Sequence, residues 1–366
     1  MEACGGNRFW GHPKSIDMSI ASDSNSQTPL SKTTSGSDQL QESVPETAFK
    51  HHISRPPMVD AQSRIMWEYV IGIAVFHAMI LLLFVPHVGS YLFSWWGLLW
   101  LPVGNFLFCS MGIGAGLHRL HTHRSFKCPL WFEHVLAILG VCCLQDTPVR
   151  WVVVHRLHHQ FSDHEPDPHT PMVTWFWGHV GWLFIENRQV TSAETYDRYA
   201  KDLLRDPFYM KMERSFLYIW INVAQLMLFY LVGFAIGFLL THNLWDSTRI
   251  SVQWAYWGVF MRIVYTWNVT WAVNSISHMY GYRNYETREN SRNNWLVALA
   301  TSGEGWHNNH HVDPRSCAHG HRWWEVDLTY TTICLLGKLG LAWDIVPPTQ
   351  SLLERRAKNA VAGKGA

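Results

Sequence analysis

Long apolar segments alternate with polar stretches along this chain, and each of the four longest reaches the roughly 20 residues that a helix needs to cross a bilayer. These four segments cover approximately residues 66–86, 92–116, 216–240 and 252–273. Short connections join the first segment to the second and the third to the fourth, which predicts two helical hairpins. Two further stretches, about 130–145 and 323–346, are shorter or interrupted by acids, and they predict interfacial or core helices. The pattern therefore predicts an all-α, polytopic membrane protein with four transmembrane helices and a helical cap, which the charge distribution described below places in the cytoplasm.

The two ends of the chain are polar. Residues 1–62 have almost no apolar periodicity, which predicts a disordered tail, and their acidic residues argue against an organelle transit peptide. Residues 351–366 are predicted to form a charged tail. Residues 63–350 then form a single membrane domain.

The distribution of basic residues predicts an orientation in the membrane. The segment between the two predicted hairpins is rich in Lys and Arg, whereas the first short connection has none and the second has only Arg249. The positive-inside rule places this segment in the cytoplasm, and four crossings place both termini there too. A formal net charge of +1 gives no electrostatic case for binding nucleic acid. The 21 Trp residues are typical of a protein whose aromatic side chains lie at a membrane boundary.

Three histidine clusters border the apolar segments, and all three fall on the predicted cytoplasmic side. They are His118-Arg-Leu-His-Thr-His123, His155-Arg-Leu-His-His159 and His307-Asn-Asn-His-His311. Histidine is the commonest side chain for binding a transition metal near neutral pH. The H-x-x-H-H spacing of the last two clusters places three imidazoles on one face of a helix. Chance is the alternative in a chain with 22 His, but chance does not readily produce the same triplet twice.

The first cluster leaves two alternatives open. His118 and His123 are five residues apart, about 140° around an α-helix, so both face one site only if the helix ends or loosens there. His121 is the alternative partner of His118. A fourth element, Asn274-Ser-Ile-Ser-His278, offers His278 as a ligand and Asn274 as the holder of a metal-bound water, or else a polar pair that caps a helix.

The number of imidazoles predicts more than one metal. With one histidine taken from the 121/123 alternatives, nine rings result, whereas one zinc ion takes four ligands, or three and a water. The nine rings therefore predict two metals. Imidazole suits Zn, Cu, Fe and Ni alike, so the ligand type by itself does not name the metal.

The order and spacing of these motifs resemble those of the membrane fatty-acid desaturases, most closely the acyl-CoA or Δ9-type branch that includes the stearoyl-CoA enzymes. The matching motifs are H-R-L-x-x-H at 118–123, H-R-x-H-H at 155–159, N-S-x-x-H at 274–278 and E-G-W-H-N-N-H-H at 304–311. The resemblance covers roughly residues 65–346 and includes Trp151, Asp167-Pro-His169 and Asn268-Val-Thr-Trp271.

The resemblance implies a ligand set and a reaction. The family's first box is H-x4-H, which selects His123. The implied metal ligands are His118, His123, His155, His158, His159, His278, His307, His310 and His311, with Asn274 acting through a water. Two Fe ions, O2 as oxidant and a cis double bond in a saturated fatty-acyl chain are implied, with an acyl-CoA substrate and the Δ9 position expected. A membrane hydroxylase or oxygenase of alkyl chains is the closest alternative, and a metal-ion transporter is a more distant one.

Other residues near the boxes have more open roles. Candidates to orient the ligand rings, or else ordinary solvated acids, are Asp146, Asp163, Glu165, Asp167 and Glu304. Candidates for substrate binding are Trp151, Gln145, Arg262 and Trp271. Arg262 lies inside a predicted span, where a charge is costly and by default indicates function. The small residues Gly112, Gly114, Ala115 and Gly116 leave room for an acyl channel or for close helix packing.

Two departures from the family pattern concern the partners and the substrate. The chain has no H-P-G-G haem motif, so electrons are expected from a separate cytochrome b5-like protein or a ferredoxin. Val153 and Val154 stand where the animal acyl-CoA enzymes have Arg and Asp. This difference weakens the case for CoA recognition and leaves an acyl group on a glycerolipid as an alternative.

Overall fold

The computed structural model describes residues 53, 56, 59 and 63–354. The chain divides into two units, Met1–Ala48 and Phe49–Ala366, and the first unit lies wholly outside the described residues. The polar tail predicted over 1–62 lies outside them apart from three positions, and so does most of the tail predicted over 351–366. The helices and histidine clusters all belong to the second unit.

The residues that the structure describes form helices joined by turns and loops, with isolated β-bridges and no β-strand. The first half contains α1 (Trp67–Leu81), η2 (Leu82–Phe84), α2 (Pro86–Leu92), α3 (Trp95–Gly104), η3 (Asn105–Thr122), α4 (Leu130–Val141), α5 (Pro148–Phe161), α6 (Trp175–His179), η4 (Gly181–Phe184) and α7 (Ala193–Leu204). The second half contains α8 (Pro207–Arg214), α9 (Leu217–Thr241), α10 (Leu244–Ala255), η5 (Tyr256–Met261), α11 (Arg262–Ser275), α12 (Trp295–Ala300), α13 (His307–Val312) and α14 (Leu328–Lys338). The prediction of an all-α protein is confirmed for this part of the chain.

Three helices among the described residues are long and apolar enough to cross a membrane, namely Trp67–Phe84, Trp95–Thr122 and Leu217–Thr241. They correspond to the first three predicted spans. The fourth predicted span lies in α10, η5 and α11, which follow one another without a break but are not among these three. The connection predicted before this span is wrong from residue 244 onward. Asn243 accepts hydrogen bonds from the N–H groups of Trp245 and Asp246, and so begins a helix there.

The helix that carries the first histidine cluster is α-helical at its start, in α3, and π-helical over η3. π-Helices are rare overall, but those that occur are often found at functional sites. Their i→i+5 hydrogen bonds bring residues that are five positions apart close together on one side of the helix. The backbone N–H of His123 donates to the carbonyl of His118 at 3.1 Å. The loosening that the H-x4-H spacing requires is therefore a stretch of π-helix, and it places these two rings 4.8 Å apart.

Small residues of η3 pack directly against neighbouring elements. A Cβ atom on Gly112 would lie 2.3 Å from the backbone nitrogen of Gly140 in α4. A Cβ atom on Gly114 would lie 3.0 Å from Oε1 of Glu304. These contacts support the helix-packing alternative for the small residues.

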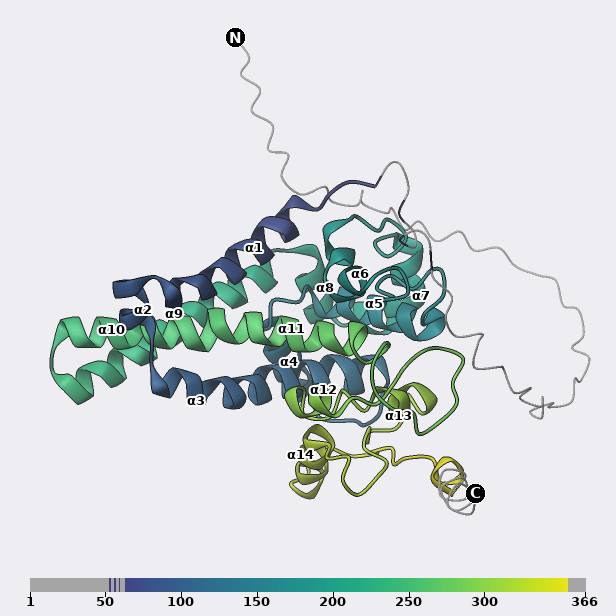
Figure 1. Cartoon of the computed structure of the whole chain (residues 1–366). Helices are drawn as coiled ribbons and strands as arrows, with labels where there is room; N and C mark the ends of the chain where they lie inside the picture. The colour runs from purple at the N-terminus through teal and green to yellow at the C-terminus, as the bar shows by residue number, and fades with distance from the viewer. Residues whose placement is uncertain (1–52, 54–55, 57–58, 60–62, 355–366) are drawn as a thin grey trace, which may run out of the picture. The chain divides into compact units, whose positions relative to one another are not determined.

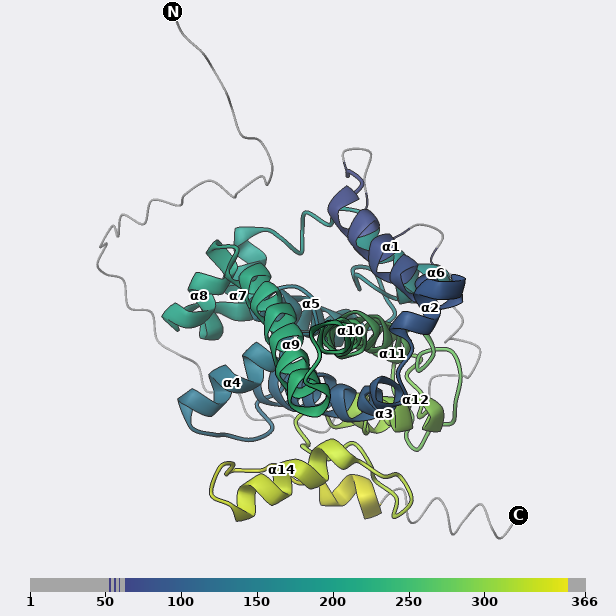
Figure 2. The same cartoon turned by 90° about the vertical axis from the view of Figure 1, so that its left-hand side faces the viewer.

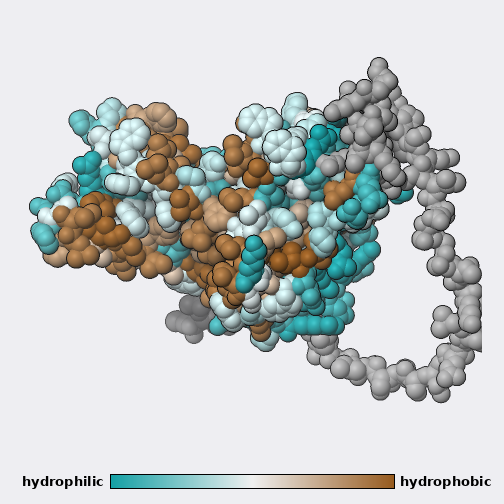
Figure 3. Space-filling view, turned by 90° about the horizontal axis from the view of Figure 1, so that it is seen from below, coloured by the Kyte–Doolittle hydropathy of each residue, from teal (hydrophilic) through white to brown (hydrophobic). Residues whose placement is uncertain are grey.

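The helices form two groups, one at each end of the part of the chain that the structure describes. Figures 1 and 2 show α3, α9, α10 and α11 side by side, with α1 at the edge of this group. Figure 1 shows α5, α6, α7 and α13 at the opposite end. On the face seen in Figure 3, hydrophobic residues gather toward the end of the long helices and hydrophilic residues toward the other end. The histidine boxes come from the C-terminal end of η3, from α5 and from α13. They therefore lie where the long helices join the second group of helices.

Candidate metal centre

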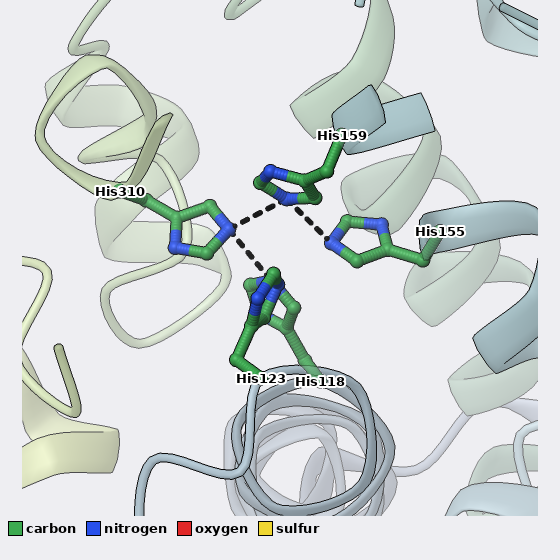
Figure 4. Close-up of side chains that lie close together, drawn as sticks. All are labelled: His118, His123, His155, His159 and His310. Atoms are coloured by element: carbon green, nitrogen blue, oxygen red, sulfur yellow. Dashed lines mark hydrogen bonds between the residues drawn. The ribbon is translucent and has the colours of Figure 1, made fainter. Parts of the chain in front are cut away.

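Five imidazoles turn toward a common point at the end of η3, and we call them the five-histidine cluster (Figure 4). His118 and His123 come from η3 and its C-cap, His155 and His159 come from α5, and His310 comes from α13. Nε2 of His310 lies 3.0 Å from Nε2 of His118 and 2.9 Å from Nε2 of His159. Nε2 of His159 lies 3.1 Å from Nε2 of His155. One ligand nitrogen from each ring lies within 4.8 Å of all the others.

A second set, the four-histidine cluster, consists of His158, His278, His307 and His311. Nε2 of His307 lies 3.0 Å from Nε2 of His278 and 3.0 Å from Nε2 of His311. The ring of His158 lies 5.1 Å from that of His278, and its Nε2 atom is buried without a hydrogen-bond partner. Buried polar atoms normally have partners, so this bare nitrogen is the arrangement expected of a metal ligand.

Each H-x-x-H-H motif contributes to both clusters. In α5, His155 and His159 belong to the five-histidine cluster, whereas His158 belongs to the four-histidine cluster. Helix α13 exchanges these roles, because its first and last histidines join the four-histidine cluster and its middle one joins the other. Each triplet thus serves two adjoining clusters rather than one. Successive positions differ by about 100° on a helix, so neighbouring histidines reach the two adjoining clusters from one helix edge.

Buried carboxylates hold the outer nitrogens of the four-histidine cluster. Oδ2 of Asp167 lies 2.9 Å from Nδ1 of His158, and Oδ2 of Asp163 lies 2.9 Å from Nδ1 of His278. Both acids lie on the turn after α5, where Asp163 has a left-handed φ of 61° and its N–H donates to Asp167. Such contacts fix the ring and its tautomer, with the proton on Nδ1 and with Nε2 left as the nitrogen that could bind a metal.

These pairs also stabilise charge. Burial by itself would raise the pKa of Asp163 and Asp167, but the neighbouring histidines outweigh it and lower the pKa of both acids. Burial by itself would lower the pKa of His278, but the carboxylate of Asp163 outweighs it and raises this pKa to about 9. The carboxylate therefore stabilises positive charge on the ring, whether a proton or a metal ion supplies it.

On the side of the five-histidine cluster, Glu304 connects a ligand ring to a buried arginine. Its Oε2 atom lies 2.5 Å from Nδ1 of His118, and its Oε1 atom accepts a hydrogen bond from Arg119 at 2.8 Å. Arg119 also donates to Oδ1 of Asp327 at 3.0 Å. Burial would raise the pKa of Glu304, but Arg119 and His118 outweigh it and lower this pKa. An ionised carboxylate therefore orients this ring too.

The protonation state of the other rings suits metal binding. Burial lowers the pKa well below the ordinary value, because a charged imidazole loses its hydration, for His123, His155, His159, His307, His310 and His311. Neutral imidazole is the form that binds metals. A donor set of imidazole nitrogens fits transition metals such as iron or zinc, whereas Ca²⁺ and Mg²⁺ prefer oxygen ligands.

Two of the acids considered from the sequence lie away from the clusters. Asp146 accepts a hydrogen bond from the hydroxyl of Tyr69 at 2.6 Å and pairs with Arg150 at 3.2 Å. Glu165 is exposed. Of the five candidate acids, Asp163, Asp167 and Glu304 therefore hold cluster histidines, and these two do not.

Two residues at the centre were not anticipated from the sequence. Oε2 of Glu289 lies 3.8 Å from Nδ1 of His311 and 4.0 Å from Nδ1 of His278. The ring of His319 lies 4.4 Å from that of His310, and its Nδ1 atom lies 3.2 Å from a nitrogen of Arg119. Glu289 comes from a loop, and no recognisable motif in the sequence around it indicated a role at the centre. The His-Gly-His run at 319–321, close after the third box, is a signal that could have indicated His319.

The structure separates the alternatives in the first element and leaves open those for Asn274 in the fourth. His123 lies in the five-histidine cluster, whereas His121 lies outside it, with its Nε2 atom 3.0 Å from the hydroxyl of Tyr209. Asn274 is half-buried in α11, four residues before His278. Its proposed action through a water stays a prediction.

Of the candidate substrate residues, Trp151 contacts the five-histidine cluster. The ring of Trp151 stacks on that of His155, with centroids 5.0 Å apart. Nε2 of Gln145 is buried without a partner, on a turn in which the neighbouring residues 144 and 146 have left-handed φ angles. Trp271 is buried in α11, where its ring packs beside that of His179 with centroids 5.7 Å apart.

Arg262 is satisfied within the protein. Its guanidinium is fully buried, lies over the ring of Phe108 at 4.1 Å, and donates to the carbonyl of Cys142 at 2.8 Å and to Oε1 of Gln225 at 2.7 Å. These contacts explain how the charge is accommodated between helices. A role in substrate binding stays a prediction.

Comparisons with known proteins agree with this arrangement. The model of the family described as "Fatty acid desaturase" matches residues 93–333. The chain is 39% identical over 288 residues to the sn-2 palmitoyl-lipid 9-desaturase of Nostoc sp. (strain 36), a match that covers 78% of the chain and 92% of that relative. It is 36% identical over 316 residues to the sn-1 stearoyl-lipid 9-desaturase of Synechocystis sp., covering 85% and 88% of the two chains. It is also 36% identical over 316 residues to an acyl-CoA 5-desaturase of Anemone leveillei, covering 84% and 91%.

Proposed function

Because the chain belongs to the fatty acid desaturase family, we propose that it is an O2-dependent, di-iron enzyme that introduces a cis double bond into a saturated fatty-acyl chain. The observation that carries this proposal is the pair of adjoining histidine clusters, whose ring nitrogens converge on two points. We assign one Fe ion to the five-histidine cluster and one to the four-histidine cluster. Asn274 is assigned to a water at the four-histidine cluster, which has one ligand fewer.

The reaction defines what the centre and its partners must supply. Two Fe ions bound in these clusters would supply an oxidant, made from O2, that removes hydrogen from an unactivated methylene. The acyl chain loses two electrons and two protons, whereas the reduction of one O2 to two waters takes four of each. Two further protons must therefore come from water, and two electrons from a separate donor, which we propose to be a cytochrome b5-like protein or a ferredoxin. The carboxylates of Asp163, Asp167 and Glu304 hold the ligand rings in place throughout.

We place the acyl group near Trp151, Gln145, Trp271 and Arg262, of which Trp151 stacks on a ring of the five-histidine cluster. The names of the relatives include both lipid-linked and acyl-CoA substrates. Val153 and Val154 of α5 are buried in the hydrophobic core and offer no charge to the phosphates of CoA. We therefore favour an acyl chain on a glycerolipid over the acyl-CoA that the resemblance implied. We keep Δ9 as the position, which the names of two relatives support.

The proposal includes a placement in the membrane. We infer a fourth crossing by α10, η5 and α11 beside the three helices that are apolar enough to span a bilayer. The Lys- and Arg-rich segment between the hairpins then lies in the cytoplasm together with the histidine clusters.

The proposal is tested by expressing the chain in host cells and mapping double bonds in their fatty acids by mass spectrometry. A new monounsaturated acid is expected, and it should disappear in a His158→Ala variant that removes one cluster ring. His121→Ala is the matched control, because this histidine lies outside both clusters. A hydroxylated chain would replace the desaturase with the oxygenase alternative. Metal flux across the membrane with an unchanged lipid profile would indicate a transporter.

A further inference from the structure

A group of exposed apolar side chains lies outside the three helices that are apolar enough to cross a membrane. Its members come from α12 and from the segment 323–328, which leads into α14. We call this group the apolar patch, and it consists of Trp295, Leu296, Leu299, Trp323, Val326 and Leu328. Leu299 is 76% exposed and Trp323 is 95% exposed. Val297 and Ala298 are the buried side of α12, so the patch residues of this helix project from its other side.

The two segments of the patch are joined by hydrogen bonds and form one surface. The backbone N–H of Thr329 donates to the carbonyl of Ser302, on the turn after α12, at 3.1 Å. The indole N–H of Trp306 donates to the carbonyl of Val326 at 2.9 Å. Figures 1 and 2 show α12 and α14 on the lower side of the molecule, which is the side seen in Figure 3. An exposed apolar surface built from two adjoining segments indicates an interaction site.

The segment 325–328 has the reverse of the pattern that a water-facing segment would have. Its two acids, Glu325 and Asp327, are buried, whereas Val326 and Leu328 are exposed. A segment in contact with water would turn its carboxylates outward and its aliphatic side chains inward. The reversed order indicates that the surroundings of this segment are themselves apolar.

The buried acids hold this segment firmly against the metal centre. Oε2 of Glu325 accepts a hydrogen bond from Nδ2 of Asn309 in α13 at 2.8 Å. Oδ1 of Asp327 accepts from Arg119 at 3.0 Å, and Arg119 also donates to Glu304, the acid that contacts a ring of the five-histidine cluster. The exposure of the patch is therefore a property of a well-anchored segment. The same stretch of chain supports the candidate centre on its inner side and presents the patch on its outer side.

The patch also adjoins the apolar face of a helix that is long enough to span a membrane. Nδ2 of Asn105, in the helix Trp95–Thr122, donates to the carbonyl of Ala300 at the end of α12 at 2.9 Å. Pro102 and Leu98 precede Asn105 by three and seven residues, which places them on the same side of this helix, and both are exposed. The face of the helix that would contact lipid therefore leads directly to α12.

We propose that the apolar patch is a lipid-binding surface, inserted into the membrane leaflet on the side of the histidine clusters. Its partner is the bilayer rather than another protein, because the patch continues the face of a helix that is apolar enough to span the membrane. The patch also presents Trp295 and Trp323, and Trp is the residue type that gathers at membrane boundaries. The inference goes beyond the proposed function, and neither iron nor substrate is needed to test it.

Photo-crosslinking to lipid tests the contact on the unmodified protein. The full chain is reconstituted into phosphatidylcholine vesicles in which a fraction of the lipid carries a diazirine in one acyl chain, irradiated, digested and mapped by mass spectrometry. Labels are expected on α12 and on residues 323–328. Helix α9 is the positive control, because it is apolar enough to span the membrane, and α7 is the negative control, because Asp197 and Lys201 are exposed on it. Labels on α9 without labels on the patch would overturn the proposal.

Two substitutions at one position then test the role of the aromatic face. Trp323→Glu places a charge in the patch, and Trp323→Phe is the matched control that stays aromatic. Because this side chain is almost fully exposed, neither change removes interior packing. We expect Trp323→Glu to lower the labelling of residues 323–328 relative to α9, and Trp323→Phe to retain it. Equal labelling of both variants and the wild type would contradict the proposal. Chemical cross-links between the patches of two chains, in place of lipid labels, would replace the bilayer with a second copy of the protein.

Discussion

The substitution Asp167→Asn tests the metal centre most sharply, because it keeps the shape of the side chain and removes its charge. Oδ2 accepts hydrogen bonds from Nδ1 of His158 at 2.9 Å and from the N–H of Asp163 at 3.0 Å. Oδ1 accepts from the N–H of His169 at 3.2 Å. The side-chain amide of the Asn variant can place its NH2 group at the position of either oxygen. In both orientations this NH2 group faces at least one N–H donor and cannot accept its hydrogen bond.

The expected magnitude follows from these contacts. Loss of a carboxylate that orients a ligand histidine typically weakens metal binding by about 10–100-fold, or roughly 1.4–2.8 kcal/mol. The buried donor left without a partner costs about 1–3 kcal/mol of folding stability in addition. Because Asp167 contacts a ring of the four-histidine cluster only, metal in the five-histidine cluster should be affected little.

The measurement is iron content per chain after equilibration with a graded series of chelator concentrations. With the two Fe ions that we propose, the variant should release one equivalent at a free-iron level about 10–100-fold higher than the wild type does, and the second at the wild-type level. Asp146→Asn is the matched control, because this acid pairs with Tyr69 and Arg150 rather than with a histidine. Equal iron retention by Asp167→Asn and the wild type, or equal losses in the two variants, would refute the reasoning.

Three further outcomes are expected. His123→Ala should lower iron content whereas His121→Ala should leave it unchanged, and metal analysis of the two purified variants decides this. Gly112→Ala should destabilise the fold by about 1–3 kcal/mol, because its Cβ would meet the backbone of α4 at 2.3 Å, whereas nothing lies within 4 Å of a Cβ at Gly72. Thermal unfolding of these two Gly→Ala variants in one detergent checks the difference, and equal melting temperatures would contradict it. Glu289→Gln should weaken iron binding less than Asp167→Asn does in the same chelator series, because its carboxylate lies 3.8–4.0 Å from two ligand rings, beyond hydrogen-bond distance.

Local periodicity predicted the helices well but located the fourth long helix incompletely. The long apolar runs over Trp67–Phe84, Trp95–Thr122 and Leu217–Thr241 are readable because hydrocarbon thickness sets a minimum length on any span. The polar residues Asp246 and Arg249 instead suggested a connection, although they lie inside α10. Helix caps and tertiary packing, rather than hydropathy, determine where that helix begins.

The sequence by itself determined which residue types form the candidate centre, because H-x-x-H-H and H-x4-H are spacings within single helices and need no knowledge of the fold. It also determined that neighbouring acids such as Asp163 and Asp167 were available. Only the tertiary structure decided the division of each triplet between two clusters and the contacts of Glu289 and His319. Each of these depends on which faces of helices and loops far apart in the sequence pack against one another. The spacing of residues along one segment carries no information about that packing.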